Sequence, residues 1–200
     1  NPQLATSGTT ADAASYQIYD RLLEFDPVTN KIVPGLASSW LVSKNGLVYT
    51  FQLRKDVSFH SNDEFLPTRN FNADDVIFSM NRWRSWDHPY HDVSGGNYPY
   101  FASLELDTVI QEIKRIIGYR IEIHLNKPDS SFLANLATDF AIVLSAEYGD
   151  VLLTKGTPEL IDENPIGTGP FQFKRHLKDR YIRYVKNPNY WREIPISKQL

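Results

Sequence analysis

Asn164-Pro165-Ile166-Gly167-Thr168-Gly169-Pro170-Phe171 is the stretch of this 200-residue sequence that decides how the chain is organised. Two prolines and two glycines lie within residues 165–170. Glycine permits backbone conformations with positive φ, whereas proline holds φ at about −65° and has no amide hydrogen to donate. Because neither a helix nor a central strand can continue through such a run, the stretch predicts a stiff turn.

The sequence pattern differs on the two sides of this turn. The residues before it are mixed and partly helical, whereas residues 171–185 look like strands. We interpret the turn as a place where the chain crosses between two structural units. An ordinary surface turn also explains this composition, and the residues alone leave both interpretations open.

Composition sets the broad class of the protein. The sequence is 42% hydrophobic, 13% aromatic and 22% charged, as in globular proteins with one large domain or one domain plus part of another. The formal net charge of −3 provides no overall basic field for nucleic acid or anionic membranes. Cysteine is absent, which excludes disulfides and thiolate chemistry.

The two ends of the sequence look like cuts. No initiator Met and no signal-peptide pattern opens the chain, and no apolar run approaches the roughly 20 residues that span a bilayer. Residues 194–200 resemble the lead into a further strand. We therefore expect the sequence to be part of a longer chain.

Residues 40–54 predict a β-hairpin. Asn45-Gly46 is a pair typical of tight hairpin turns, and apolar residues alternate with polar ones over residues 48–54. The expected core residues of this hairpin are Trp40, Tyr49 and Phe51.

A helix is predicted to begin after Asn72, which is a suitable N-cap. Asp74 and Asp75 follow in the first turn, where the helix dipole favours negative charge. A catalytic pair of carboxylates is the alternative, but adjacent helical residues do not face each other. Capping is therefore the favoured interpretation.

Other elements follow from periodicity and turn residues. We expect further helices over residues 12–23, 101–110, 130–138 and 146–156. We expect a short strand or a bulge over residues 57–60, and further strands over residues 111–115, 121–125 and 140–144, with 121–125 pairing with 111–115.

Two loops carry groups that suit a ligand. Thr6-Ser7-Gly8-Thr9-Thr10 has four hydroxyls around a glycine, so backbone amides and hydroxyls can approach a bound molecule; the same residues could instead lead into a helix capped by Asp12. Residues 87–100 form a long loop whose exposed tyrosines suit a ligand wall. Packing of this loop onto its own domain is the alternative.

Catalytic chemistry has little support in the sequence. His88 and His91 have an i, i+3 spacing that two metal ligands could use, but a third ligand is not evident and Pro89 argues against a helix presenting both rings. Gly167-Thr168-Gly169 lacks the features of a phosphate loop or dinucleotide fingerprint, and Gly-x-Ser-x-Gly does not occur. We expect no enzyme, no metal and no cofactor; a metal-dependent hydrolase that uses His88 and His91 is the remaining alternative.

Five segments together resemble one family, the peptide/oligopeptide/nickel class of extracytoplasmic solute-binding proteins. Their order and spacing match that class across most of the chain. The segments are Pro34–Trp40, Tyr49–Arg54, Asn72–Ser79, Pro165–Phe171 and Asn187–Trp191. Within the class the chain is most similar to the dipeptide-binding branch, which includes haem-binding and glutathione-binding lipoproteins. The segments that carry this finer similarity are Asn1–Leu4, Thr6–Thr9, Pro67–Arg69, Pro89–His91, Val93–Gly96 and Gly156–Glu159.

The resemblance implies an α/β fold of the periplasmic-binding-protein type, a bilobed clamp that closes on its ligand. This chain would carry first-lobe segments plus an inserted mixed α/β subdomain. The expected division is residues 1–19 for a first-lobe segment, 20–167 for the inserted subdomain, and 168–200 for the return to the first lobe with an incomplete sheet. The turn at residues 164–171 then lies where the chain crosses from the inserted subdomain to the first lobe.

The resemblance also implies a function: the substrate-binding component of an ABC importer that captures dipeptides, glutathione or haem. Such a protein is a monomer that delivers its ligand to a membrane permease. It is periplasmic or extracytoplasmic, and a lipid anchor is one option for the full-length protein. It binds no nucleic acid. The rival interpretation is an interaction module that uses the tyrosine-rich loop to dock a partner protein.

Ligand-binding residues carried over from the family are few. In the family, one segment lays its backbone against the bound peptide, and this segment matches Thr6, Ser7 and Gly8. The family's aromatic pocket wall matches Tyr98 and Tyr100. A further stretch near the ligand matches Asp139, Phe140 and Ala141. Residues 116–120 depart from the family, which usually has an Asp in that turn.

Overall fold

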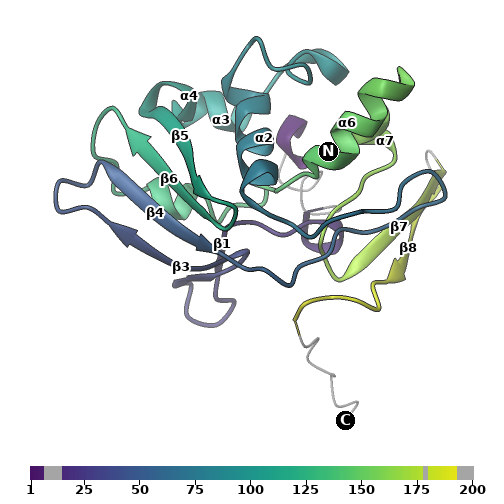
Figure 1. Cartoon of the computed structure of the whole chain (residues 1–200), viewed down its shortest axis with the longest axis horizontal. Coiled ribbons are helices and arrows are strands. Elements are labelled where there is room, and N and C mark those ends of the chain that lie inside the picture. The colour runs from purple at the N-terminus through teal and green to yellow at the C-terminus, as the bar shows by residue number, and fades with distance from the viewer. Residues whose placement is uncertain (7–14, 178–179, 193–200) are drawn as a thin grey trace.

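The computed structural model describes residues 1–6, 15–177 and 180–192. An antiparallel four-stranded sheet with strand order β3-β4-β6-β5 lies at one end of the molecule, helices pack beside it, and the hairpin β7–β8 lies at the other end (Figure 1). Among the described residues, no helix is long and apolar enough to cross a membrane.

The bounds of the elements are as follows. The strands are β1 (Leu23–Phe25), β2 (Ile32–Pro34), β3 (Ala37–Val42), β4 (Val48–Leu53), β5 (Ile110–Ile117), β6 (Arg120–Leu125), β7 (Phe171–Leu177) and β8 (Tyr181–Lys186). The helices are η1 (Pro2–Leu4), α2 (Ala73–Arg84), η2 (Val93–Gly95), α3 (Pro99–Ser103), α4 (Leu106–Val109), α5 (Phe132–Asn135), α6 (Ala146–Lys155) and α7 (Leu160–Glu163). Residues 15–18 are also helical.

The predicted hairpin is confirmed as β3 and β4, joined through Gly46 at φ 69°. Tyr49 and Phe51 are buried on the inner face of β4, as expected from their period-two spacing. Trp40 pairs with Phe51 across the strands but is only partly buried, because β3 is an edge strand. The predicted pairing of residues 111–115 with 121–125 is also confirmed, as β5 and β6.

The acidic pair at the start of α2 caps the helix, as predicted. The Asn72 side chain accepts from the Asp74 amide at 2.8 Å, and the Asp75 carboxylate accepts from the Asn72 amide at 2.9 Å. The Asp75 carboxylate also accepts from the Ala146 amide at 2.9 Å, at the start of α6, and pairs with Arg69 at 2.7 Å. One buried carboxylate therefore stabilises the N-termini of two helices.

Three predicted helices differ in the structure, and the one expected over residues 130–138 is shortened to α5. The helix expected over residues 12–23 includes residues 15–18, but Leu23 begins strand β1 because the carbonyls of Arg21 and Leu22 accept from residues 35–37; residues 12–14 lie outside the described residues. The helix expected over 101–110 is divided into α3 and α4 at Glu105, which has φ 53°.

The predicted strand over residues 140–144 is wrong, and of the short strand or bulge predicted over residues 57–60 the structure shows no strand. Residues 57–60 are irregular, and His60 donates its amide to the Gly167 carbonyl at 2.8 Å. Residues 140–144 are largely buried but form only an isolated bridge, between Ile142 and Arg21. Apolar runs this short do not distinguish a strand from an irregular buried segment.

The run of residues 164–171 is a turn, as predicted, and it packs directly against Ile18. The Gly169 amide donates to the Ile18 carbonyl at 2.8 Å. A Cβ added at Gly167 would lie 2.0 Å from the Ile18 carbonyl oxygen, and one at Gly169 would lie 2.6 Å from its carbonyl carbon. Glycine is therefore required at both positions for this close approach.

Asp20 connects the turn to the residues after β8. Its carboxylate accepts from the Thr168 hydroxyl at 2.8 Å, from the Trp191 indole N–H at 2.8 Å and from the Tyr190 hydroxyl at 3.3 Å. Asp20 is 2% exposed and Thr168 is fully buried. Such a buried carboxylate is stable because neutral donors satisfy its oxygens.

His60 lies between the two glycines of the turn. Its Nε2 lies 2.8 Å from the Gly169 carbonyl, which can only accept, so Nε2 carries the proton; Nδ1 accepts from the Gly167 amide at 3.3 Å. Burial lowers the pKa of His60 from 6.5 to about 4, although the Gly169 carbonyl and Asp20 oppose this shift. The neutral imidazole is therefore the form that fits the turn.

We predict that Gly167→Ala destabilises the protein by about 1–3 kcal/mol, because the new methyl group overlaps the Ile18 carbonyl. Gly118→Ala is the matched control, since a Cβ at Gly118 meets nothing within 4 Å. Chemical denaturation of both variants measures the difference. Equal stability of the two variants would contradict the close approach.

We predict that stability falls as the pH drops from about 6.5 to about 4. The pKa of His60 is lower in the folded than in the unfolded state, so its contribution is complete above 6.5 and is lost as the pH falls towards 4. The shift in the pKa of His60 corresponds to a contribution of about 3 kcal/mol to the free energy of unfolding. Denaturation at several pH values should show a shallower pH dependence for His60→Gln. Burial of His88 lowers its pKa to about 4 as well, so part of the dependence of stability on pH should remain in His60→Gln. If the pH dependence of His60→Gln is identical to that of the wild type, His60 is not the group responsible.

Candidate functional site

Residues 139–143 lie alongside residues 15–21, although the two segments are far apart in sequence. The Val143 amide donates to the Asp20 carbonyl at 3.0 Å, Ile142 bridges Arg21 in antiparallel fashion, and the Ser15 hydroxyl donates to the Asp139 carbonyl. The pairing brings the predicted site residues 139–141 next to the helical residues that follow the Thr6-Ser7-Gly8 segment.

Arg21 supports this pairing from within the protein. Its Nη1 donates to the Ser15 hydroxyl at 3.0 Å, and its guanidinium lies over the Tyr16 ring at 4.4 Å. It forms an ion pair with Glu24 at 3.8 Å, and Glu24 pairs more closely with Arg192, at 2.6 Å. Arg21 is only 4% exposed. Arg21 therefore contacts Ser15, Tyr16 and Glu24 from its buried position.

Sequence reasoning missed Ser15 and Arg21. The apolar spacing of residues 12–23 predicts a single helix, in which an arginine is usually a surface residue. The structure ends that helix early and turns Arg21 inward. The sequence around Arg21 carries no local signal of its contacts with Ser15 and Glu24, because these contacts depend on the path of the backbone.

Tyr100 and Phe140 form the aromatic part of the candidate site. Their rings stack with centroids 4.8 Å apart and planes 1° apart, and Phe140 meets Phe101 edge-on at 5.0 Å. Phe140 is buried, whereas Tyr100 is only partly buried. The structure therefore brings Tyr100 together with the 139–141 segment, and Tyr100 presents the accessible part of this aromatic stack.

Tyr98 does not stand exposed on its loop, which corrects the expectation of an exposed tyrosine wall. It is 6% exposed, and its hydroxyl donates to the His91 carbonyl at 2.8 Å. Burial raises the pKa of Tyr98. Tyr90, on the same loop, is fully buried and donates to the Gly149 carbonyl at 2.7 Å. The loop packs onto its own domain, the alternative that the sequence left open.

A buried ion pair holds this loop in place. Arg82 contacts Asp162 through two hydrogen bonds of 2.8 and 2.6 Å and also donates to the Tyr90 carbonyl at 3.3 Å. Burial by itself raises the pKa of Asp162, but the hydrogen bonds and charge of Arg82 outweigh it and the pKa is lowered. Asp162 is therefore ionised, and the pair connects α2, the loop and α7.

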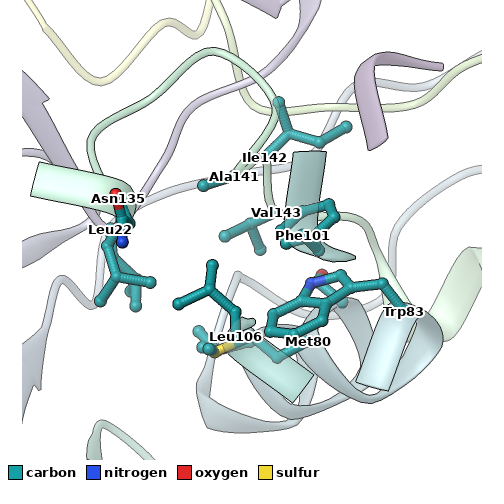
Figure 2. Close-up of a pocket in the computed structure, with 12 residues that line it drawn as sticks. Leu22, Met80, Trp83, Phe101, Leu106, Asn135, Ala141, Ile142 and Val143 are labelled. Carbon is teal, nitrogen blue, oxygen red and sulfur yellow. The ribbon is translucent and has the colours of Figure 1, made fainter. Parts of the chain in front are cut away.

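The remaining predicted residues lie elsewhere. Thr6 is exposed, and Ser7 and Gly8 lie outside the described residues. Ala141 lines a small internal cavity together with Trp83, Phe101, Leu106 and other mostly apolar side chains (Figure 2). Its volume of about 20 Å³ is close to that of a single water site, so this cavity is a gap in core packing rather than a ligand pocket.

The two histidines considered as metal ligands take part in packing. His88 Nδ1 accepts from the Tyr90 amide at 3.2 Å, and His91 Nδ1 lies 2.8 Å from the Arg82 carbonyl. Within the described part of the chain, no group of three or more His, Cys, Asp or Glu side chains could hold a metal ion.

Comparison with known proteins places this geometry in a family. Residues 31–200 match the family described as bacterial extracellular solute-binding proteins, family 5 Middle. The chain is 51% identical over 195 residues to the dipeptide-binding protein of Escherichia coli (strain K12), covering 98% of this chain and 36% of that protein. It is 47% identical over 192 residues to heme-binding protein A of Haemophilus influenzae, covering 96% of this chain and 35% of that protein.

A solved structure extends the comparison to three dimensions. The dipeptide binding protein from Pseudoalteromonas sp. SM9913 in complex with Met-Leu superposes with a TM-score of 0.94 at 46% identity, over 96% of this chain and 38% of that one. The chain thus spans about a third of the length of the relatives it matches. The expected α/β fold of the periplasmic-binding-protein type is confirmed. This chain belongs to family 5 of the bacterial extracellular solute-binding proteins.

Proposed function

We propose that the complete protein is the substrate-binding component of an ABC importer and captures a dipeptide-sized ligand. The observation that carries the proposal is the close match of 96% of this chain to a protein crystallised with Met-Leu. Glutathione and haem are the rival ligands, and the 47% identity to a heme-binding protein supports testing haem directly. No catalytic step is part of this proposal.

The proposed site uses main chain more than reactive side chains. Thr6, Ser7 and Gly8 supply backbone groups that pair with the peptide as a neighbouring strand would, which tolerates many ligand side chains. Asp139, Phe140 and Ala141 supply a second stretch of backbone, supported by the pairing of residues 139–143 with residues 15–21.

The tyrosines have different roles in this proposal. The partly buried Tyr100 offers its ring to the ligand, stacked from behind by Phe140. Tyr98 supports the loop from inside, because its hydroxyl is already bonded to the His91 carbonyl. This burial disfavours an interaction module that docks a partner through exposed tyrosines.

We further propose the division into residues 1–19, 20–167 and 168–200. Its support is that both boundaries fall at one place, where residues 18–20 lie against residues 167–169. A groove of about 830 Å³ lies beside the hairpin β7–β8, lined by Tyr19, Phe173 and Tyr184 among others. An uncovered hairpin of this kind suits a first-lobe sheet completed by further strands, with closure by a hinge motion between lobes.

The proposal includes location and partners. The complete protein acts outside the cytoplasmic membrane, in the periplasm where one is present, as a monomer that delivers its ligand to a membrane permease. A lipid anchor on the full-length protein is compatible with this role. The family assignment supports the extracytoplasmic location.

Calorimetric titration of the complete protein with dipeptides, glutathione and haemin tests the ligand. We expect a dipeptide to bind with a Kd of roughly 1 μM or below, equivalent to about −8 kcal/mol or better. Binding of haemin alone would transfer the assignment to the haem branch. The absence of heat with all three ligands would reject the peptide-branch function.

Ser15→Ala in the complete protein should weaken dipeptide binding roughly tenfold, because loss of about one hydrogen bond releases the 139–141 backbone. Arg21→Met should act in the same direction through Ser15. Ser38→Ala is the matched control, since Ser38 is exposed on the edge strand β3. Calorimetry gives the affinity, and thermal melting checks that the variants are folded. Unchanged affinity in folded Ser15→Ala would exclude this segment from the site.

A further inference from the structure

The hairpin β7–β8 is the most basic part of an acidic chain. The net charge of the sequence is −3, yet residues 174–186 contain a single acid, Asp179. The cations of this segment are Lys174, Arg175, Lys178, Arg180, Arg183 and Lys186. Local charge of this kind creates a positive field even where the net charge of the chain is negative.

Two of these arginines stand directly opposite each other. The register pairs Arg175 with Arg183, and like charges in directly opposed positions destabilise an antiparallel pair. Arg175 donates to the Tyr181 hydroxyl and lies 5.4 Å from the centre of its ring. Within residues 1–6, 15–177 and 180–192, no carboxylate forms an ion pair with either arginine. The repulsion is therefore not relieved by this part of the chain.

Apolar side chains accompany the arginines on the same face. Residues opposite each other in an antiparallel pair share a face, and the next pair points the other way. Arg175 and Arg183 therefore share a face with the pair Leu177 and Tyr181, which are 38% and 42% exposed. We call these four residues the outer face of the hairpin. The other face includes His176 and Ile182, which line the groove, and Arg175 also contributes to the lining of that groove.

The composition of the outer face suits a protein partner with carboxylates. Arginine and tyrosine are enriched at protein interfaces, where lysine is depleted. The planar fork of arginine binds a carboxylate through two hydrogen bonds, which a point charge cannot reproduce. A partner carboxylate between Arg175 and Arg183 would remove their repulsion, while Leu177 and Tyr181 would bury apolar surface beside it.

We propose that the outer face of β7–β8 docks an acidic surface of the importer's membrane component. This inference rests on the proposed function and adds the surface through which the protein meets its partner. The hairpin lies at one end of the molecule, opposite the four-stranded sheet (Figure 1). None of the residues proposed for ligand contact belongs to it, so docking leaves the ligand site occupied. Because the arginines are exposed, salt weakens the contact.

The test compares two double variants of the complete protein. Arg175→Glu with Arg183→Glu reverses the outer face; Lys31→Glu with Lys44→Glu reverses two exposed cations outside the hairpin and is the matched control. Affinity is measured against the membrane component reconstituted in nanodiscs, at low and high salt, and dipeptide affinity is measured by calorimetry. We expect the arginine variant to dock at least roughly tenfold more weakly at low salt, and the control to dock like the wild type. Dipeptide affinity stays unchanged in both.

Each of the following results would contradict the proposal that the outer face docks the membrane component. Equal docking of the arginine variant and the wild type removes the surface from the interface. Loss of thermal stability or of dipeptide affinity in the arginine variant assigns the arginines to contacts within the complete protein. Arginine-dependent binding to vesicles of phosphatidylcholine and phosphatidylglycerol, equal to that seen with nanodiscs, assigns the face to lipid. A wild-type protein that binds none of the tested ligands rejects the proposed function separately.

Discussion

The approach of the 167–169 backbone to the Ile18 carbonyl is the constraint on which the rest of this structure depends. No side chain fits between the two segments at Gly167 or Gly169. The polar groups that this contact buries are satisfied by His60, in its neutral form, and by the carboxylate of Asp20. Buried polar groups of this kind stabilise only when every partner is in place, so these residues act as one unit.

The same unit positions the candidate ligand site. Asp20 binds Thr168 through its side chain and the Val143 amide through its carbonyl, so one residue connects the turn to the 139–143 segment. Arg21, the next residue, holds Ser15 against the Asp139 carbonyl. A surface built from paired backbone and an aromatic stack suits capture of a peptide-like solute, which needs shape and hydrogen bonds rather than a reactive group.

Buried charge serves packing throughout the described part of the chain. Asp75 stabilises two helix N-termini and pairs with Arg69, while Arg82 and Asp162 hold the tyrosine loop against α2 and α7. Removing one partner of such a pair leaves an uncompensated buried charge and costs about 3–5 kcal/mol. The arginines of β7–β8 differ from these, since both are exposed and no carboxylate of the described chain forms an ion pair with either of them.

The sequence alone determined the features that depend on neighbouring residues. The Asn72 cap, the Asn45-Gly46 hairpin and the alternation in β4 need only local geometry, and the spacing of five segments was enough to indicate the family. The tertiary structure decided the partners of Asp20, His60 and Arg21, the burial of Tyr98 and the irregular path of residues 140–144. These depend on contacts between residues far apart in the chain, and local propensity carries no information about which distant backbone or carboxylate will satisfy a buried polar group.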